Sequence, residues 1–243
     1  MTGRLGGPVA APLLEFVAAR TDGNALFMVT IVEHLVQQGV VGRQEGQGTL
    51  REGTEAPEAS LPEGLRAMLR RRIEALAPEA RRVLEAASVV GETFAAAAVA
   101  AGAQCAVEDV EAVCEELVVQ QHFLDDSGLT AWPDGTSGGS YGFRHVLYQQ
   151  VLYERLGATR RMQLHRRIGI RLETAYGARA GELAAQLALH FERGGETSQA
   201  VSYWQQAGDN AARRNAHHDA VAILTKGLAL LATLPESPER ARH

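Results

Sequence analysis

The chain has 243 residues and a formal net charge of −5, so its overall charge gives no reason to expect binding to nucleic acid. Hydrophobic residues make up 46% of it, enough for a packed core, and alanine and leucine supply most of them, which favours helices. No stretch approaches the roughly 18 apolar residues of a membrane-spanning helix, and the N-terminus lacks the apolar segment of a secretory signal. We therefore expect a mainly α-helical, cytoplasmic protein that does not bind membranes.

Residues 1–59 are predicted to contain two helices and a small β-hairpin. Apolar residues at helical spacing indicate the first helix, over 12–19. Asn24 is a suitable N-cap for the second. A glycine-rich turn between Val40-Val41 and Thr49-Leu50 predicts the hairpin.

Residues 60–176 are predicted to form helices that are followed by strands. Pro62 stands at the first position of a helix, where proline is tolerated, and Pro78 begins the next. Residues 91–93 are interpreted as a turn and 94–101 as a short helix. The third main helix is expected over 107–120.

Three short strands are expected after these helices, separated by polar or glycine-rich turns: Phe123-Leu124, Thr130–Trp132 and Tyr141–Phe143. Helices followed by strands in this order favour a winged-helix unit. A further apolar helix is predicted directly after Arg144-His145, so that His145 lies at its N-terminus. Gly157 ends that helix, and Thr159 is predicted to cap an arginine-rich helix.

Residues 177–243 are predicted to be antiparallel helical pairs. The pair Ala200-Val201 recurs as Ala220-Val221, each shortly after a turn. Small residues at fixed places on successive helices let helices pack closely, as in helical repeat proteins. We therefore predict the start of an array that resembles tetratricopeptide repeats.

Three segments together resemble STAND-class signalling ATPases, which are AAA-like proteins that include large LuxR-type regulators and cyclase- or kinase-linked ATPases. The segment 21–27, TDGNALF, resembles a motif of their lid helices, and 61–94 resembles the start of their winged-helix domain. The segment Phe143–Leu147, FRHVL, resembles the motif at the end of that domain. The resemblance implies that His145 contacts the β-phosphate of bound ADP, with Arg144, Asn24 and Ala25 as neighbouring nucleotide-sensing residues.

The catalytic half of that family is missing from this chain. A phosphate-binding loop needs the pattern GxxxxGK[ST], and Lys226, the chain's single lysine, stands in no such frame. Ala25 also replaces the family's proline. We therefore expect a non-enzymatic regulatory portion that binds no cofactor by itself. ATP or ADP would be held by an ATPase core in the same or another chain.

His145 alone would bind a phosphate weakly. One charge-assisted hydrogen bond contributes roughly 1.5–3 kcal/mol and a helix dipole about 0.3–1 kcal/mol. Together these correspond to an affinity no tighter than about millimolar. His145 can therefore sense a nucleotide that another domain holds. The alternative is a buried structural histidine with a satisfied hydrogen bond.

Other candidate sites are weaker. The helix at 107–120 carries five acids and no basic residue, so direct DNA binding through it is not expected. The arginine-rich helix is interpreted as a solvated face paired with acids. His217 and His218 lack further ligands at metal-binding spacing, and no metal site is predicted.

Three hypotheses follow. The chain is a regulatory module of a STAND-class ATPase whose repeats receive a protein or small-ligand signal, a stand-alone interaction module, or a winged-helix DNA-binding regulator. For the first two, four aromatic residues are candidates for contact with a partner: Tyr203, Trp204, His190 and Phe191.

Overall fold

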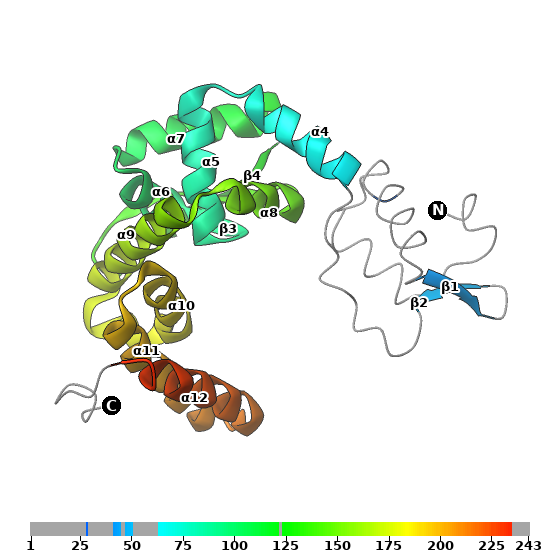
Figure 1. The fold of residues 1–243 in the computed structure, drawn as a ribbon. Helices are drawn as coiled ribbons and strands as arrows, with labels where there is room; N and C mark the ends of the chain where they lie inside the picture. The colour runs from blue at the N-terminus through cyan, green and yellow to red at the C-terminus, as the bar shows by residue number, and fades with distance from the viewer. Residues whose placement is uncertain (1–27, 29–40, 45–46, 51–62, 122, 235–243) are drawn as a thin grey trace.

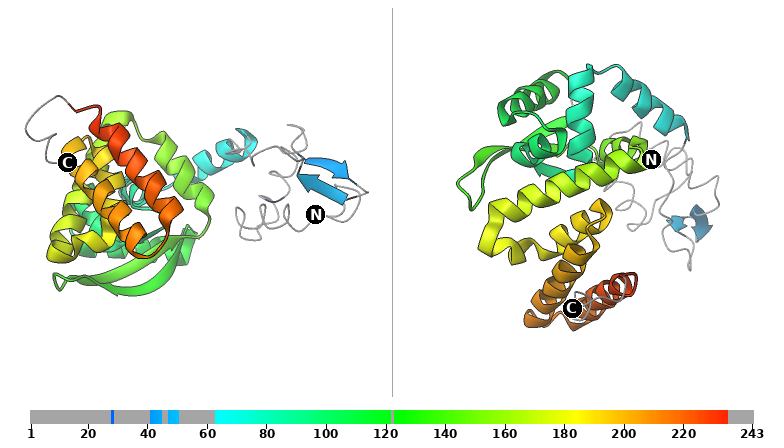
Figure 2. Two further views of the ribbon diagram at one scale, coloured as in Figure 1. Left: turned by 90° about the horizontal axis from the view of Figure 1, so that it is seen from below. Right: turned by 60° about the vertical axis from the view of Figure 1, so that its left-hand side comes forward.

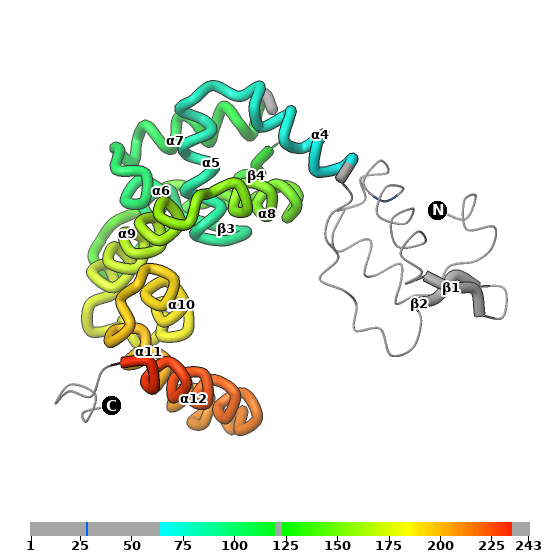
Figure 3. Tube along the Cα trace, in the orientation of Figure 1, coloured from blue at the N-terminus to red at the C-terminus, as the bar shows by residue number. Residues whose placement is uncertain are grey.

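The computed structural model describes residues 28, 41–44, 47–50, 63–121 and 123–234. Strands β1 (Val41–Gln44) and β2 (Gln47–Leu50) pair antiparallel, with Val41 opposite Leu50, which confirms the predicted hairpin. Of the helices predicted before it, only Met28 is described, and it is helical; Asn24, Ala25 and Pro62 lie outside the described residues. The described part of the chain is mainly helical, as expected (Figures 1 and 3).

Four helices lie between residues 63 and 116: α4 (Glu63–Glu74), α5 (Pro78–Val90), α6 (Ala96–Ala103) and α7 (Val107–Glu116), and α7 continues into a π-helical turn, η1 (Leu117–Gln121). Apolar residues of α4 recur every four positions and are buried: Leu65, Leu69 and Ile73. Pro78 occupies the first turn of α5, as predicted.

The sheet is antiparallel and has the order β3-β5-β4, formed by Thr93–Ala95, Ser137–Phe143 and Leu124–Ala131. Two predictions are wrong here. Thr93 belongs to a strand and not to a turn, because it pairs with Gly142 of β5. The first two expected strands are one strand, β4, with an irregularity between Asp126 and Leu129 where the pairing shifts. The β4–β5 hairpin extends along one side of the molecule (Figure 2).

Two helices follow the sheet, α8 (Val146–Arg155) and α9 (Ala158–Tyr176). Thr159 is not the N-cap of α9, because the helix begins at Ala158 and Gly157 takes the cap position with an extended backbone. Beyond α9 the chain forms a 3₁₀ segment, η2 (Gly177–Leu183), and then α10 (Ala184–Gly194), α11 (Thr197–Arg213) and α12 (His217–Leu231). Each of these helices lies beside the next (Figures 1 and 2).

Small residues lie where these last helices cross, as predicted. Ala200 and Ala220 are buried. A Cβ atom placed on Gly208 would lie 2.4 Å from Leu224 Cδ2, and one on Gly227 would lie 3.1 Å from Trp204 Cβ. The close approach of α11 and α12 therefore depends on the missing side chains.

One hydrophobic core runs from Leu65 to Ala207 without a break. Helix α9 connects its two parts, since it packs against α5 and α6 on one side and against α10 on the other. A Cβ on Gly102 of α6 would lie 3.2 Å from Ile168 Cγ1, and one on Gly169 would lie 3.2 Å from His190 Cβ. The expected division at 176/177 therefore does not coincide with a gap in the core.

Within these described residues, no helix combines the length and the hydropathy needed to cross a membrane.

Candidate functional site

His145 occupies the N-cap position of α8, two residues after the end of β5, as predicted. Its backbone is fixed from both sides. The Arg144 N–H donates to the Phe123 carbonyl at 3.0 Å, and the His145 carbonyl accepts from the Tyr148 N–H at 3.0 Å. The sheet therefore holds the start of α8 in place, where the helix dipole favours an anion.

The half-buried His145 ring faces Tyr148, with ring centroids 6.1 Å apart and planes inclined by 27°. Tyr148 is itself anchored, since it is fully buried, lies 4.5 Å from Phe123 between ring centroids, and accepts a 2.9 Å hydrogen bond from Arg72 Nη1. The imidazole is thus supported by a rigid aromatic neighbour.

Arg144 joins the end of β5 to the start of β4. Its Nε donates to Asp125 Oδ1 at 3.0 Å, and its Nη2 lies 2.9 Å from the same oxygen. The structure therefore brings Arg144 and His145 together at the N-terminus of α8, while the other two predicted nucleotide-sensing residues, Asn24 and Ala25, lie outside the described residues.

A buried histidine pair, which sequence reasoning missed, lies between α8, α9 and α10. His165 Nδ1 and His190 Nδ1 are 3.0 Å apart, and His165 Nε2 lies 2.9 Å from the Tyr153 hydroxyl. Arg193 Nη1 donates to the same hydroxyl at 3.1 Å. The Arg161 guanidinium lies 4.4 Å above the Tyr153 ring.

The geometry requires one proton between the two Nδ1 atoms. Two N–H groups facing each other at this distance would repel. Two unprotonated nitrogens would both be acceptors, and neither would have a hydrogen-bond donor. Burial, with the charges of His190, Arg193 and Arg161, lowers the pKa of His165 to about 3. Burial and Arg193 lower the pKa of His190 to about 4. The pair is therefore neutral near pH 7 and joins the three helices as a hydrogen-bonded unit.

The four residues predicted to contact a partner are buried, so a partner cannot reach them on the described surface. They are Tyr203, Trp204, His190 and Phe191, none more than 8% exposed. Their polar atoms are engaged in holding helices together: the Tyr203 hydroxyl donates to Glu173 Oε1 at 2.7 Å, and Trp204 Nε1 donates to Glu192 Oε2 at 2.9 Å. The prediction mistook a helix–helix contact for an exposed face.

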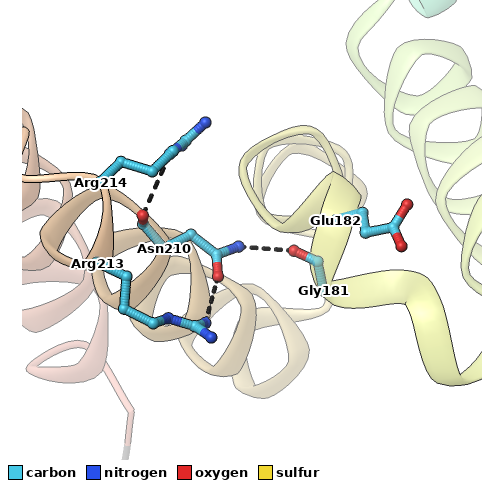
Figure 4. A pocket seen from close by; sticks show the side chains of 5 residues that line it. All are labelled: Gly181, Glu182, Asn210, Arg213 and Arg214. Atoms are coloured by element: carbon cyan, nitrogen blue, oxygen red, sulfur yellow. Dashed lines mark hydrogen bonds between the residues drawn. The ribbon is translucent and has the colours of Figure 1, made fainter.

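A cavity of about 580 Å³ opens between η2 and the end of α11 (Figure 4). Asn210 spans it, donating from Nδ2 to the Gly181 carbonyl at 2.7 Å. Arg213 Nη2 donates to Asn210 Oδ1, and Arg214 Nε donates to the backbone carbonyl of Asn210 at 3.2 Å. Glu182 also lines the cavity, but its side chain points away from Asn210 and is paired with Arg179 at 2.7 and 2.9 Å (Figure 4).

The third main helix, α7, remains a poor surface for DNA. Four of its acids are exposed: Glu108, Asp109, Glu115 and Glu116. The fifth, Glu111, accepts a 2.7 Å hydrogen bond from the Gly139 N–H and so ties α7 to β5. Phosphates would meet negative charge along this helix.

The turn between β4 and β5 is bound to α9 through Arg171. Its Nη1 lies 2.7 Å from Asp134 Oδ2, its Nη2 donates to Thr136 Oγ1 at 2.7 Å, and its guanidinium lies 4.7 Å above the Trp132 ring. The Thr136 backbone N–H and Arg171 together lower the pKa of Asp134 to about 2. The arginine-rich helix is thus paired with acids, as predicted, through Arg171 and also Arg160 and Arg166.

Across the residues that the structure describes, no group of three or more His, Cys, Asp or Glu side chains is arranged to hold a metal ion.

Comparison with known proteins gives one informative match. The chain is 34% identical over 98 residues to an uncharacterized protein of Rhizobium meliloti (strain 1021). The match covers 40% of this chain but only 10% of that relative, which is therefore much longer than the aligned segment. No protein-family model matches the chain, and no solved structure matches it.

Proposed function

We propose that this chain is a non-catalytic regulatory portion of a STAND-class signal-transducing ATPase. In this proposal, residues 60–176 form a winged-helix unit and residues 177–243 begin a tetratricopeptide-like array. An ATP-binding core, in the same or another polypeptide, supplies the nucleotide.

The observation that carries the proposal is the position of His145. It occupies the N-cap position of α8 two residues after β5, the Arg144 N–H beside it donates to the Phe123 carbonyl, and its ring faces the buried Tyr148. A histidine fixed at a helix N-terminus suits a single contact to a phosphate. These residues fit one phosphate contact and not a whole nucleotide site, which agrees with a sensing role.

The element order supports the two finer assignments. Helices α5, α6 and α7 precede the β4–β5 hairpin and pack around the small antiparallel sheet, which suits a winged helix. Helices α10, α11 and α12 lie beside one another with glycine and alanine at their crossings, which suits a helical repeat array. Both finer assignments are part of the proposal.

The proposed mechanism is conformational. His145 stabilises the ADP-bound, inactive arrangement by contacting the nucleotide across the interface with the core. A signal that binds the repeats more tightly in the active arrangement then shifts the equilibrium away from it. Helix α9 is the physical connection, because it packs against both the winged-helix side and α10.

The test is His145→Ala in a polypeptide that also carries the ATP-binding core. Losing a charge-assisted contact worth roughly 1.5–3 kcal/mol should raise the ADP dissociation rate by about ten- to a hundredfold. His217→Ala, which removes an exposed histidine at the start of α12, is the matched control. An ADP dissociation rate that is the same in both variants would contradict the proposal.

A stand-alone interaction module is the second candidate. One observation favours it: Val221 and Leu228 of α12 are 66% and 64% exposed, on a helix whose other face packs against α11. In this case Val221→Ser with Leu228→Ser should abolish capture of a protein partner. A partner retained by that variant would count against it.

Direct DNA binding has less support, because α7 is acidic and the hairpin turn is tied to α9.

A further inference from the structure

A second cavity, of about 370 Å³ and with a basic lining, lies between α5, the end of α6 and α9. Its polar lining consists of three arginines and two glutamines: Arg82, Arg160, Arg167, Gln104 and Gln163. His145 and the cavity between η2 and α11 contribute none of its lining. The cavity is therefore separate from the site proposed above.

The positive charge of this cavity is only partly compensated. Arg160 Nη2 lies 3.1 Å from Glu85 Oε2. Arg167 donates from Nη1 to the Gly102 carbonyl at 3.3 Å and has no carboxylate partner among the described residues. Arg82 makes neither an ion pair nor a hydrogen bond with any residue that the structure describes. Arg82 and Arg167 thus line the cavity without a carboxylate at ion-pair distance among the described residues.

The walls of the cavity are fixed by the fold. Gly102 lets the end of α6 approach α9, since a Cβ there would lie 3.2 Å from Ile168 Cγ1. Gln104 then adopts a left-handed backbone conformation, with φ of 58°, and lines the cavity. Glycine or asparagine usually takes this place after a helix, so glutamine is held there at a cost in backbone strain.

We propose that this cavity binds a small phosphorylated molecule. Guanidinium groups match the geometry of phosphate oxygens, and the side-chain amides of Gln104 and Gln163 can donate further hydrogen bonds. The volume lies in the range of small-ligand pockets, about 300–1,000 Å³. A bound phosphate would supply the counter-charge that Arg82 and Arg167 lack.

Calorimetric titration with pyrophosphate tests the proposal directly. The unmodified chain should bind, and the double variant Arg82→Gln with Arg167→Gln should bind at least tenfold more weakly. Arg213→Gln with Arg214→Gln removes the same charge from the other cavity and should bind like the unmodified chain. Absence of binding, or equal weakening in both double variants, would overturn the proposal.

Cys105 provides a local readout. It follows Gln104 and is half-buried, whereas the other cysteine, Cys114, is fully buried. Burial raises the pKa of the Cys105 thiol, while the positive charge of Arg82 acts in the opposite direction. An anion beside Arg82 should therefore slow labelling of Cys105 by a thiol reagent. An unchanged labelling rate at saturating pyrophosphate would contradict this location.

Two further variants separate the alternatives. Gln104→Gly should weaken pyrophosphate binding while raising thermal stability, because glycine relieves the left-handed conformation. His145→Ala should leave pyrophosphate binding unchanged. If His145→Ala abolished it, the anion would belong to the N-terminus of α8 and this proposal would fail, while the proposed sensing role would not.

Discussion

At the scale of single residues, the buried pair of His165 and His190 makes stability depend on pH. Their pKa values in the folded protein, about 3 and about 4, lie below the ordinary value of 6.5. As the pH falls below 6.5, the unfolded chain takes up protons that the folded chain does not. Stability is therefore lost from pH 6.5 down to about 4 through His190 and down to about 3 through His165, by up to about 1.4 kcal/mol per pH unit for each histidine.

Urea unfolding at pH 7 and pH 5 measures this effect. His190→Gln should lower the free energy of unfolding at pH 7, because it breaks the contact with His165, but should flatten its decline towards pH 5. His217→Gln, which changes an exposed histidine, should leave the decline as it is in the unmodified chain. An equally steep decline in His190→Gln would show that the pair does not carry the pH dependence.

The local sequence predicted the position of some of these residues but not the contacts of others. The N-cap position of His145 could be read from the change of apolar spacing between strand and helix at that point. The contact between His165 and His190 could not, because 25 residues separate them and the contact depends on how α9 meets α10. For the same reason, nothing local showed that Tyr203 and Trp204 are buried.

At the scale of elements, glycines set the distance between helices. Gly208→Ala should destabilise the protein by about 1–3 kcal/mol, because a Cβ at this position would overlap Leu224 of α12. Gly64→Ala in α4 is the matched control. A Cβ there would meet nothing within 4 Å, and alanine should stabilise the helix by roughly 0.5–1 kcal/mol. Thermal unfolding of both variants distinguishes the two effects, and a neutral Gly208→Ala would refute the close crossing of α11 and α12.

The elements that were mispredicted depend on distant pairing. Strand β3 has three residues and begins two positions after Gly91, so the local pattern of residues 91–93 indicated a turn. It becomes a strand because β5, more than 40 residues later, supplies hydrogen-bond partners. Strand β4 was predicted as two strands because Gly128 and its polar neighbours interrupt the alternation of apolar and polar residues. Helices, whose hydrogen bonds are local, were predicted more accurately.

At the scale of the whole molecule, the continuous core predicts one cooperative unfolding transition for the part that the structure describes. The two tryptophans report on different places, since Trp132 lies in the turn between β4 and β5 and Trp204 lies in α11. In Trp132→Phe and in Trp204→Phe, the remaining tryptophan's fluorescence and far-UV circular dichroism should give the same urea midpoint. Separate midpoints would mean that the two sides of α9 unfold independently.

The crossing of α11 and α12 also has a consequence for how this sequence can diverge. Gly208 faces Leu224, and Gly227 faces Trp204, at distances that leave no space for an added carbon atom without movement. Related proteins that keep this crossing should therefore change such positions in pairs. A larger residue at position 208 should accompany a smaller one at 224, so an inherited substitution at one position restricts which substitutions the other can accept.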